Sequence, residues 1–507
     1  MDGSGSGKSS SYSIPNAYQM LGSYVFTDPK GELYDTTAGY LKQHGYDIKV
    51  LNLVRPQYSD GYNPLMHVAS DIDVDVIANT IVKGQKSEMG SQDPYWDDMA
   101  EMLLKALIYY LIATRPDEEQ NLASCAELVR AANTNGGSNL LTELMSQLPY
   151  DHSARMYYKS VEIASDKTYA SILSSLQSKL GKFDSKEIAE LTSTDTINFE
   201  EIGSRKTAVY VISSDTHTAY DFLLTIFFSQ MIQQLYDYAD QNGGKLKEQT
   251  FFILDEFANI GKIPDFDKKI STSRSRNISF SVILQNIDQL EAVYEKSYET
   301  IMGNCDTHLF LGSNSYKTLE YFSKALGEKT IERDNISVNR DKQNMRTGKS
   351  VSDQIMARAL MTPDELRRLD RDECIIFESG IRPIKAKKFY YFKHPMAKEM
   401  EACKISHNDI GEIDRGTWRK YNPYNPYVPG QEEKPQQDLK VESLDDLFED
   451  EDTSVETKPT EEKPIIEEAP VLPQEPEENE NTADEYDLQK ELEAKFDELF
   501  GKPNDDE

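Results

Sequence analysis

The chain has 507 residues, with 88 acidic and 55 basic side chains and a formal net charge of -33. At roughly 150 residues per domain, this length allows about two to four domains and a sizeable buried core. The charge argues against a nucleic-acid binder held by bulk positive charge. Residues 431–507, however, hold 29 of the acidic and 7 of the basic side chains, a net charge of -22. The argument against nucleic-acid binding therefore applies to this segment, and only weakly to residues 1–430, whose net charge is -11.

The four cysteines are scattered, and none forms a C-x-x-C pair. They are typical of reduced thiols in a cytosolic protein and indicate neither a zinc site nor a disulfide framework. The best candidate for a membrane span, residues 103–114, is shorter than the ~18–20 residues that cross a bilayer and contains Lys105. The first residues, MDGSGSGKSSSY, do not resemble a signal peptide.

Short apolar runs bounded by turn residues predict strands in two parts of the chain, separated by about 100 residues with helical periodicity (93–200). Strands that are apolar throughout, with helix-length stretches between them, indicate a mainly parallel sheet covered on both faces. We therefore expect an α/β domain interrupted by an all-α insertion. The predicted strands cover residues 24–28, 47–53, 207–212, 250–256, 278–285 and 307–312, with a further strand-like run at 387–392.

The C-terminal part has a different composition. A Pro/Tyr-rich linker (421–430) precedes an acidic tail whose low hydrophobicity and high charge predict disorder. Within the tail, residues 487–500 place Leu and Phe at helix-face spacing, which is typical of a short helix that docks in a hydrophobic groove. A charged solubilising tail with incidental Leu and Phe is the alternative. An acidic tail would repel DNA, so the partner of the tail would be a protein with a basic surface.

The N-terminal segment GSGSGKSS (3–10) has the composition of a phosphate-binding loop. Glycines let successive backbone N–H groups face phosphate oxygens, while the lysine reaches the terminal phosphates and the serine hydroxyl binds Mg²⁺. Two features depart from this pattern: Asp2 occupies the first glycine position, and no strand precedes the loop. A flexible linker is the alternative. The candidate ATP-binding residues are Gly3, Gly5, Ser6, Gly7, Lys8, Ser9 and Ser10.

Two further segments carry residues suited to ATP hydrolysis. The apolar run at 250–254 ends in Asp255 and Glu256, which indicates a buried strand delivering an Mg²⁺ ligand and an acid that activates water. Gln285 ends the next apolar run, where an amide could contact the γ-phosphate or the attacking water. Arg274 and Arg276 lie between these strands, and one of them could complete a neighbouring subunit's site. Ordinary surface polarity is the alternative for each.

Taken together, these segments resemble the coupling ATPases of type IV secretion and conjugation systems, the TraG/TraD-like family, in the form common in Gram-positive conjugative elements. The resemblance covers about residues 3–395. It rests on the glycine loop and on the segments SYVFTDPKGELY (23–34), YNPL (62–65), DPYWDDMAEMLLKALIYYL (93–111), LDEFANIGKIPDF (254–266), ILQNIDQLEAVYE (283–295) and LMTPDELRRL (360–369).

The resemblance implies a RecA-like P-loop domain with an inserted all-α domain. It implies ATP and Mg²⁺ as cofactors, with Ser9 and Asp255 as metal ligands and Glu256, Arg274 and Gln285 as catalytic residues. The DPKGEL turn (28–33) would lie near the nucleotide, with no chemical step assigned to it. The expected domains are 1–99 and 204–400 for the two parts of the nucleotide-binding domain, 100–203 for the insertion, 401–430 for the linker and 431–507 for the tail.

Family members work as hexameric rings at the cytoplasmic face of the cell membrane, where they bring a relaxase–DNA substrate to the secretion channel. The resemblance therefore implies single-stranded DNA with relaxase, and relaxosome and channel proteins, as partners. Members begin with membrane helices and a strand before the loop, so we expect this chain alone to bind ATP poorly. The basic stretches 83–90, 273–277 and 382–388 are the candidate DNA contacts. An FtsK-like DNA pump and a non-catalytic adaptor that gathers secretion substrates are the alternative functions.

Overall fold

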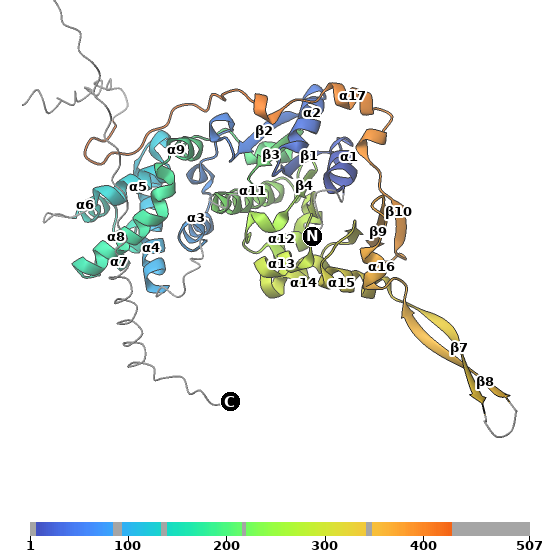
Figure 1. The fold of residues 1–507 in the computed structure, drawn as a ribbon. Coiled ribbons are helices and arrows are strands. Elements are labelled where there is room, and N and C mark those ends of the chain that lie inside the picture. Colours follow the sequence, from blue (N-terminus) through green and yellow to red (C-terminus); the bar gives the residue numbers. More distant parts are fainter. Residues whose placement is uncertain (1–6, 85–93, 133–138, 215–219, 341–346, 428–507) are drawn as a thin grey trace, which may run out of the picture. The chain divides into compact units, whose positions relative to one another are not determined.

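The computed structural model describes residues 7–84, 94–132, 139–214, 220–340 and 347–427, all of which belong to one compact unit (Figure 1). Its centre is a five-stranded sheet in the order β2-β3-β1-β4-β5, and all neighbouring strands are parallel. The five corresponding strand predictions are confirmed. The strands are β1 (Ser23–Thr27), β2 (Asp47–Asn52), β3 (Thr207–Ile212), β4 (Thr250–Leu254) and β5 (Ile278–Val282).

Helices cover both faces of the sheet, which is why its central strands β1, β3 and β4 are largely apolar. On β1, Val25 points into the larger core, which it shares with α3 (Asp71–Lys83) and α11 (Asp221–Gln241). Tyr24 and Phe26 point the other way, into a second core formed with α1 (Ile14–Ala17), α2 (Gly39–Gln43) and the π-helical turn η2 (Tyr34–Ala38). Successive side chains of a strand point to opposite faces of the sheet, so the two cores lie on opposite faces.

The described residues between β2 and β3 form helices and no strand. The longest of these helices, α4 (Pro94–Thr114), packs Leu103, Leu107 and Leu111 into the core, and its Lys105 pairs with Glu101 at 2.7 Å. No helix in the described ranges has the length and apolar character that would let it cross a membrane. The further helices are α4 (Pro94–Thr114), α5 (Leu122–Ala131), α6 (Leu140–Ser146), α7 (Ser153–Glu162), α8 (Asp166–Leu180), α9 (Lys186–Ser193) and α10 (Phe199–Ser204).

Beyond β5, the chain departs from the expected parallel pattern. The run at 307–312 forms β6 (Thr307–Phe310), which pairs antiparallel with β9 (Glu373–Glu378) in a separate three-stranded sheet with β10 (Ile384–Lys387). A long hairpin, β7 (Glu328–Arg340) and β8 (Thr347–Ala359), projects from the body (Figure 1). The helices beyond β5 are α13 (Ile287–Tyr294), α14 (Tyr298–Gly303), α15 (Tyr316–Leu326), α16 (Pro363–Arg367) and α17 (Ala397–Ala402), whereas α12 (Phe266–Thr272) lies between β4 and β5.

The strand predicted at 387–392 was wrong. Only Lys387 belongs to a strand, and Tyr391–Lys393 form a 3-10 turn. The reason lies in Lys388, whose buried ammonium group donates hydrogen bonds to the carbonyls of Leu311 and Arg371, both at 2.8 Å. These bonds turn the chain away from the sheet. The predicted acidic tail and its helix at 487–500 lie outside the described residues.

Candidate functional site

The predicted site residues converge at the carboxyl edge of the parallel sheet. Asp28 follows β1, Asp255 follows β4, and Gln285 lies three residues beyond β5. The register pairs Thr27 with Leu254, so Asp28 and Asp255 are the next residues on adjacent strands. Ligands of open α/β sheets bind in the crevice outside the carboxyl ends of the strands. The observed sheet therefore places these side chains where such a crevice forms.

The glycine loop brings a lysine to this edge. Gly7 adopts a left-handed conformation with φ of 78°, which a glycine adopts without strain, and its carbonyl accepts a hydrogen bond from the backbone of Ser11 at 2.7 Å. The Lys8 ammonium lies 3.9 Å from the Asp255 carboxylate. Ser9 and Ser10 lie in the first helical turn after the loop. Gly3, Gly5 and Ser6 lie outside the described residues.

Hydrogen bonds to the backbone carbonyl and to the side-chain carboxylate fix the position of Asp255. Its carbonyl accepts a hydrogen bond from the Thr27 hydroxyl at 2.7 Å, and its carboxylate accepts one from the backbone N–H of Glu256 at 3.0 Å. Burial raises the pKa of this carboxyl, and the positive charge of Lys8 opposes that shift. A partly buried acid facing a lysine is the electrostatic arrangement expected where a cation and phosphates bind.

Glu256 occupies a strained turn. Its φ of 51° is unusual for a residue with a side chain, and such strain clusters at functional sites. Gln285 donates a hydrogen bond to one carboxylate oxygen at 3.2 Å, and Asn259 donates one to the other at 3.1 Å. The two amides fix the carboxylate at the edge of the sheet. Glu256 and Gln285, which lie 29 residues apart in the chain, are thus in direct contact.

The structure distinguishes the two arginines of the segment 273–277. Arg276 donates two hydrogen bonds of 3.0 Å to Asp240, and its guanidinium lies over the ring of Tyr236. Arg274 has a side chain that is 93% exposed, with Asp306 at 3.9 Å. Arg276 is therefore engaged within its own chain, whereas Arg274 is presented to the outside.

A cavity of about 1050 Å³ lies between β5 and β6, and Lys8, Arg274 and Gln285 are among the residues that line it. Tyr12 reaches across its wall to hydrogen-bond Ser281 on β5 at 2.8 Å. Within the described ranges, β5 pairs only with β4, so its outer backbone edge faces this cavity. The expectation that this chain alone binds ATP poorly stays a prediction.

Three residues near the site were not assigned a role from sequence. Asp28 is only 2% exposed, and burial raises its pKa to about 6. Thr27 and Asn259 make the hydrogen bonds described above. The DPKGEL signature drew attention to Asp28, but its burial depends on tertiary packing. Asn259 lies one helical turn after Glu256, a spacing that could have suggested the contact.

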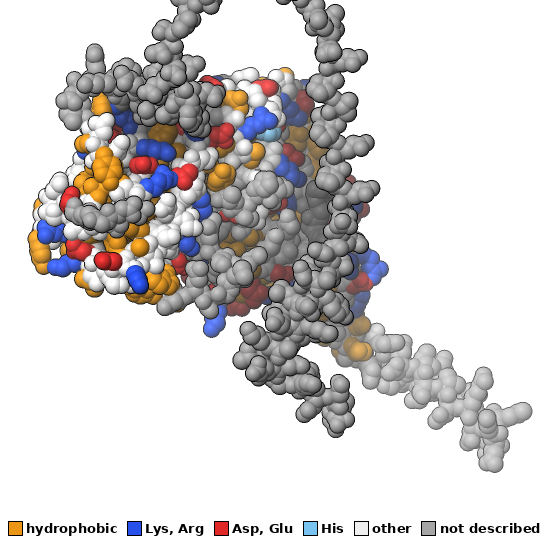
Figure 2. All heavy atoms as spheres, turned by 60° about the vertical axis from the view of Figure 1, so that its left-hand side comes forward, with side chains coloured by type: hydrophobic (Ala, Val, Ile, Leu, Met, Phe, Trp, Pro, Cys, Tyr) orange, Lys and Arg blue, Asp and Glu red, His pale blue; other side chains and the backbone are white. Residues whose placement is uncertain are grey.

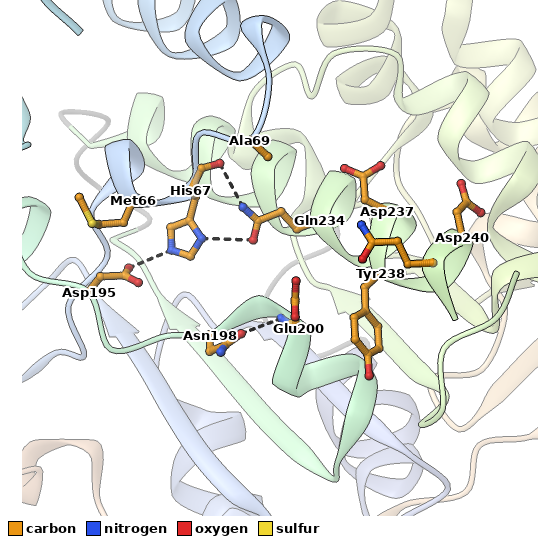
Figure 3. Close-up of a pocket in the computed structure, with 11 residues that line it drawn as sticks. Met66, His67, Ala69, Asp195, Asn198, Glu200, Gln234, Asp237, Tyr238 and Asp240 are labelled. Carbon is orange, nitrogen blue, oxygen red and sulfur yellow. Dashed lines mark hydrogen bonds and ion pairs between the residues drawn. The ribbon is translucent and has the colours of Figure 1, made fainter. Parts of the chain in front are cut away.

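A second cavity, of about 940 Å³, is lined by the 3-10 turn η4 (Pro64–His67), by α10 and the loop before it, and by α11 (Figure 3). The His67 ring contacts Asp195 at 2.9 Å and Gln234 at 3.3 Å. Glu200 and Asp237 add carboxylates, so the cavity is acidic. None of the predicted catalytic or ATP-binding residues is among its lining residues.

The basic stretches proposed as DNA contacts are largely occupied within the chain. Lys83 pairs with Asp98 at 2.6 Å and Glu101 at 2.9 Å, and residues 85–90 lie outside the described ranges. Lys388 is buried, and Lys385 pairs with Glu373 at 2.7 Å. Figure 2 shows basic and acidic side chains interspersed over the described part of one face. Among the described cations of the predicted stretches, these observations leave Arg274, Arg382 and Lys387 as exposed and without an ion pair closer than 3.9 Å.

The chain is similar in sequence to known conjugal transfer proteins. The chain is 24% identical over 413 residues to a probable conjugal transfer protein TraG of Sinorhizobium fredii, covering 79% of this chain and 62% of that protein. It is 22% identical over 418 residues to the protein VirD4 of Agrobacterium fabrum, covering 79% and 59%. The chain thus spans about three-fifths of the length of these relatives.

Solved structures give the same result for the fold. The bacterial conjugative coupling protein TrwBdeltaN70 is 18% identical, with a TM-score of 0.52 over 76% of this chain and 82% of that one. The plasmid coupling protein TrwB in complex with the ATP analogue ADPNP is 17% identical, with a TM-score of 0.50 over 82% and 87%. The fold is therefore the RecA-like α/β fold with an inserted all-α domain. The sequence profile for type IV secretory system conjugative DNA transfer matches residues 1–411. The chain belongs to this conjugative DNA transfer family.

Proposed function

We propose that this chain is the ATP-driven coupling motor of a conjugative type IV secretion system. The motor recruits a relaxase–DNA substrate and helps to pass the DNA through the secretion channel. The observation that carries the proposal is the convergence of Lys8, Asp255, Glu256 and Gln285 at the carboxyl edge of one parallel sheet. The family membership supplies the biological context.

The proposed ATP site consists of the glycine loop and Lys8, with Ser9 and Asp255 as ligands of Mg²⁺. Oxygen ligands of this kind suit Mg²⁺, and the lysine and the buried acid face the same space, so the residues present fit the group. The bound metal would neutralise charge on the phosphates. Gly3, Gly5, Ser6, Gly7 and Ser10 would contribute the loop that faces those phosphates.

Glu256 is the proposed general base and water-positioning residue. Its carboxylate accepts hydrogen bonds from both Gln285 and Asn259, which hold it in one orientation. Gln285 thereby connects the acid to the end of β5, where a displacement of its amide would alter the orientation of the base. This contact is the proposed means by which Gln285 senses the state of the nucleotide.

Arg274 is the proposed arginine finger for a neighbouring subunit. A finger must extend beyond its own chain, and Arg274 is exposed whereas Arg276 is held by Asp240. The motor would act as a homo-hexamer at the cytoplasmic face of the membrane, with single-stranded DNA as cargo. Relaxosome and channel proteins would be its protein partners, and the acidic tail is one proposed contact for them.

The proposal is tested by measuring ATP binding and hydrolysis by the full chain. We expect the unaltered chain to bind ATP weakly. Lys8→Ala should abolish this binding, and Glu256→Gln should preserve it but lower the hydrolysis rate by at least about 100-fold. The exposed residues Lys245 and Glu187 provide matched controls, Lys245→Ala and Glu187→Gln, which should leave both quantities unchanged. Hydrolysis that persists in Glu256→Gln would refute the assignment of the base. A chain that neither binds nor hydrolyses ATP would favour the adaptor function.

A further inference from the structure

The chain does not leave the body after α17. Residues 403–427 contain only short turns and no long element, yet they run from α17 past β2 to α9 and α5 (orange in Figure 1). This segment includes most of the expected Pro/Tyr linker. An irregular segment keeps one course across a protein only when its backbone and side chains find partners on the surface beneath it. The partners of residues 403–427 fall into three groups.

The first group lies on the DPKGEL turn and the helical turn after it. The backbone N–H of Ile405 donates to the Asp35 carbonyl at 3.1 Å. The backbone N–H and the Nδ1 of His407 lie 2.5 and 2.9 Å from the same carboxylate oxygen of Asp35. Gly31 has a φ of 72°, and a Cβ at this position would lie 2.4 Å from the His407 ring. The imidazole therefore rests directly on the glycine of the turn.

This turn lies next to the site. Asp28, its first residue, follows β1 beside Asp255, and its carboxylate accepts a hydrogen bond from the backbone of Tyr34 at 2.8 Å. A shift of the turn would therefore change the position of Asp28 beside the proposed Mg²⁺ ligand Asp255.

The second group consists of contacts made by Arg415, which connects the nucleotide-binding domain to the all-α insertion. Its side chain is only 5% exposed. One terminal nitrogen donates to the carbonyl of Pro56, in the loop after β2, at 2.9 Å. The other lies 3.1 Å from the carboxylate of Glu190 on α9. A guanidinium can bridge two acceptors in fixed directions, which a lysine ammonium does less well.

The third group lies on the all-α insertion. The backbone N–H of Tyr421 donates to the Ser124 hydroxyl on α5 at 2.8 Å, and its phenol lies 3.3 Å from that of Tyr110 on α4. The Arg115 guanidinium lies over the Tyr421 ring, 4.5 Å from its centroid. Arg419 donates its backbone N–H to the Glu118 carbonyl at 2.8 Å. The segment is therefore anchored at both of its ends and in the middle.

We propose that residues 403–427 are a coupling strap that holds the DPKGEL turn beside the nucleotide site and ties it to the all-α insertion. His407 and Arg415 are its positioning residues, and neither takes part in the chemistry. A force applied to the insertion, for example by bound cargo, would reach the turn through the strap. The effect of the strap on turnover rests on the proposed function, whereas its mechanical role does not.

Hydrogen exchange of the full chain tests the mechanical role without any nucleotide. His407→Ala should raise the exchange rates of the amides at 31–36 by roughly tenfold, the value of a lost hydrogen bond to a charged group. His407→Asn retains a donor for Asp35 and should restore most of the protection. Asn408→Ala, an exposed neighbour on the strap, is the matched control and should change nothing.

The decisive variant is Arg415→Ala, because the Arg415 guanidinium bonds to Pro56 and Glu190 and not to residues 31–36. A strap predicts faster exchange at 31–36 in this variant too, by roughly threefold or more. Faster exchange only near Pro56 and α9 would overturn the proposal and reduce the segment to local packing. Arg415→Lys, which keeps the charge, distinguishes this result from a failure to fold.

Steady-state ATP hydrolysis then links the strap to the site. His407→Ala should lower kcat by roughly three- to tenfold, with a smaller change in KM and rescue by His407→Asn. An unaltered kcat together with faster exchange at 31–36 would overturn the positioning role. Absence of hydrolysis in the unaltered chain would instead count against the proposed function, and the exchange results would still decide whether the strap exists.

Discussion

The buried carboxyl of Asp28 gives a quantitative prediction about stability and pH. Its pKa is raised from 3.8 to about 6, chiefly by burial, against which the backbone N–H groups of Tyr34 and Leu33 act. The folded chain therefore binds a proton at Asp28 more tightly than the unfolded chain does. Stability from this group is fully present below pH 3.8 and is lost as pH rises to about 6, above which the loss is constant.

The size of the loss follows from the two values. At 1.36 kcal/mol per pH unit, the difference corresponds to about 3 kcal/mol at neutral pH. Asp28→Asn carries no charge and keeps an oxygen that accepts from Tyr34. We therefore expect this variant to be more stable than the unaltered chain at pH 7.5, by up to about 3 kcal/mol. The advantage should shrink steadily towards pH 4.

Urea unfolding of both chains at pH 7.5, 6 and 4.5 measures this difference in the free energy of unfolding. Asp409→Asn, at an exposed position on the strap, is the control and should show no pH-dependent difference. Asp28→Asn that is less stable at pH 7.5, or equally displaced at all three pH values, would refute the reasoning. In that case, the buried carboxylate would be stabilised by partners that outweigh its burial.

Three other predictions concern the site and the packing around it. Gln285→Glu would place a second carboxylate 3.2 Å from Glu256. The pH at which ATP hydrolysis reaches half its maximum should therefore rise by about one unit or more, because two neighbouring carboxylates resist ionising together. An unchanged pH profile would contradict the contact. Arg274→Ala should leave ATP binding unchanged because the side chain is exposed, but it should abolish hydrolysis. If the finger acts on a neighbouring subunit, mixed rings of Arg274→Ala and Glu256→Gln subunits should regain activity. Gly61→Ala would bring a Cβ to 2.4 Å from the Thr194 hydroxyl and should lower the free energy of unfolding by about 1–3 kcal/mol. A Cβ added at Gly181 would meet no atom within 4 Å, so Gly181→Ala should leave the free energy of unfolding unchanged.

The sequence predicted the centre of the fold well because the central strands β1, β3 and β4 are short, largely apolar runs, and because a carboxylate or an amide follows β4 and β5. Asp255 and Gln285 were identified from that pattern, and the sheet brings them to the same edge. The β7–β8 hairpin was missed because charges at Glu328, Lys329 and Glu332 hide any alternation of polar and apolar residues.

Other features depend on contacts between distant parts of the chain. Asp35 and His407 are 372 residues apart, and no local signal in either segment indicates that they meet. Arg415 likewise stands in a polar stretch that is typical of a solvated linker, yet its side chain is buried. The burial of Asp28 and the engagement of Arg276 by Asp240 also required the assembled structure. Sequence patterns indicate chemistry at strand ends, but not which polar residues hold the domains together.

The most direct measurement for the proposed motor is the steady-state rate of ATP hydrolysis with and without single-stranded DNA. The proposal predicts that DNA raises the rate of the unaltered chain, and that neither Lys8→Ala nor Glu256→Gln responds. The control Glu187→Gln should respond like the unaltered chain. A rate that is the same with and without DNA, or stimulation that survives Glu256→Gln, would contradict the account of a DNA-coupled ATPase.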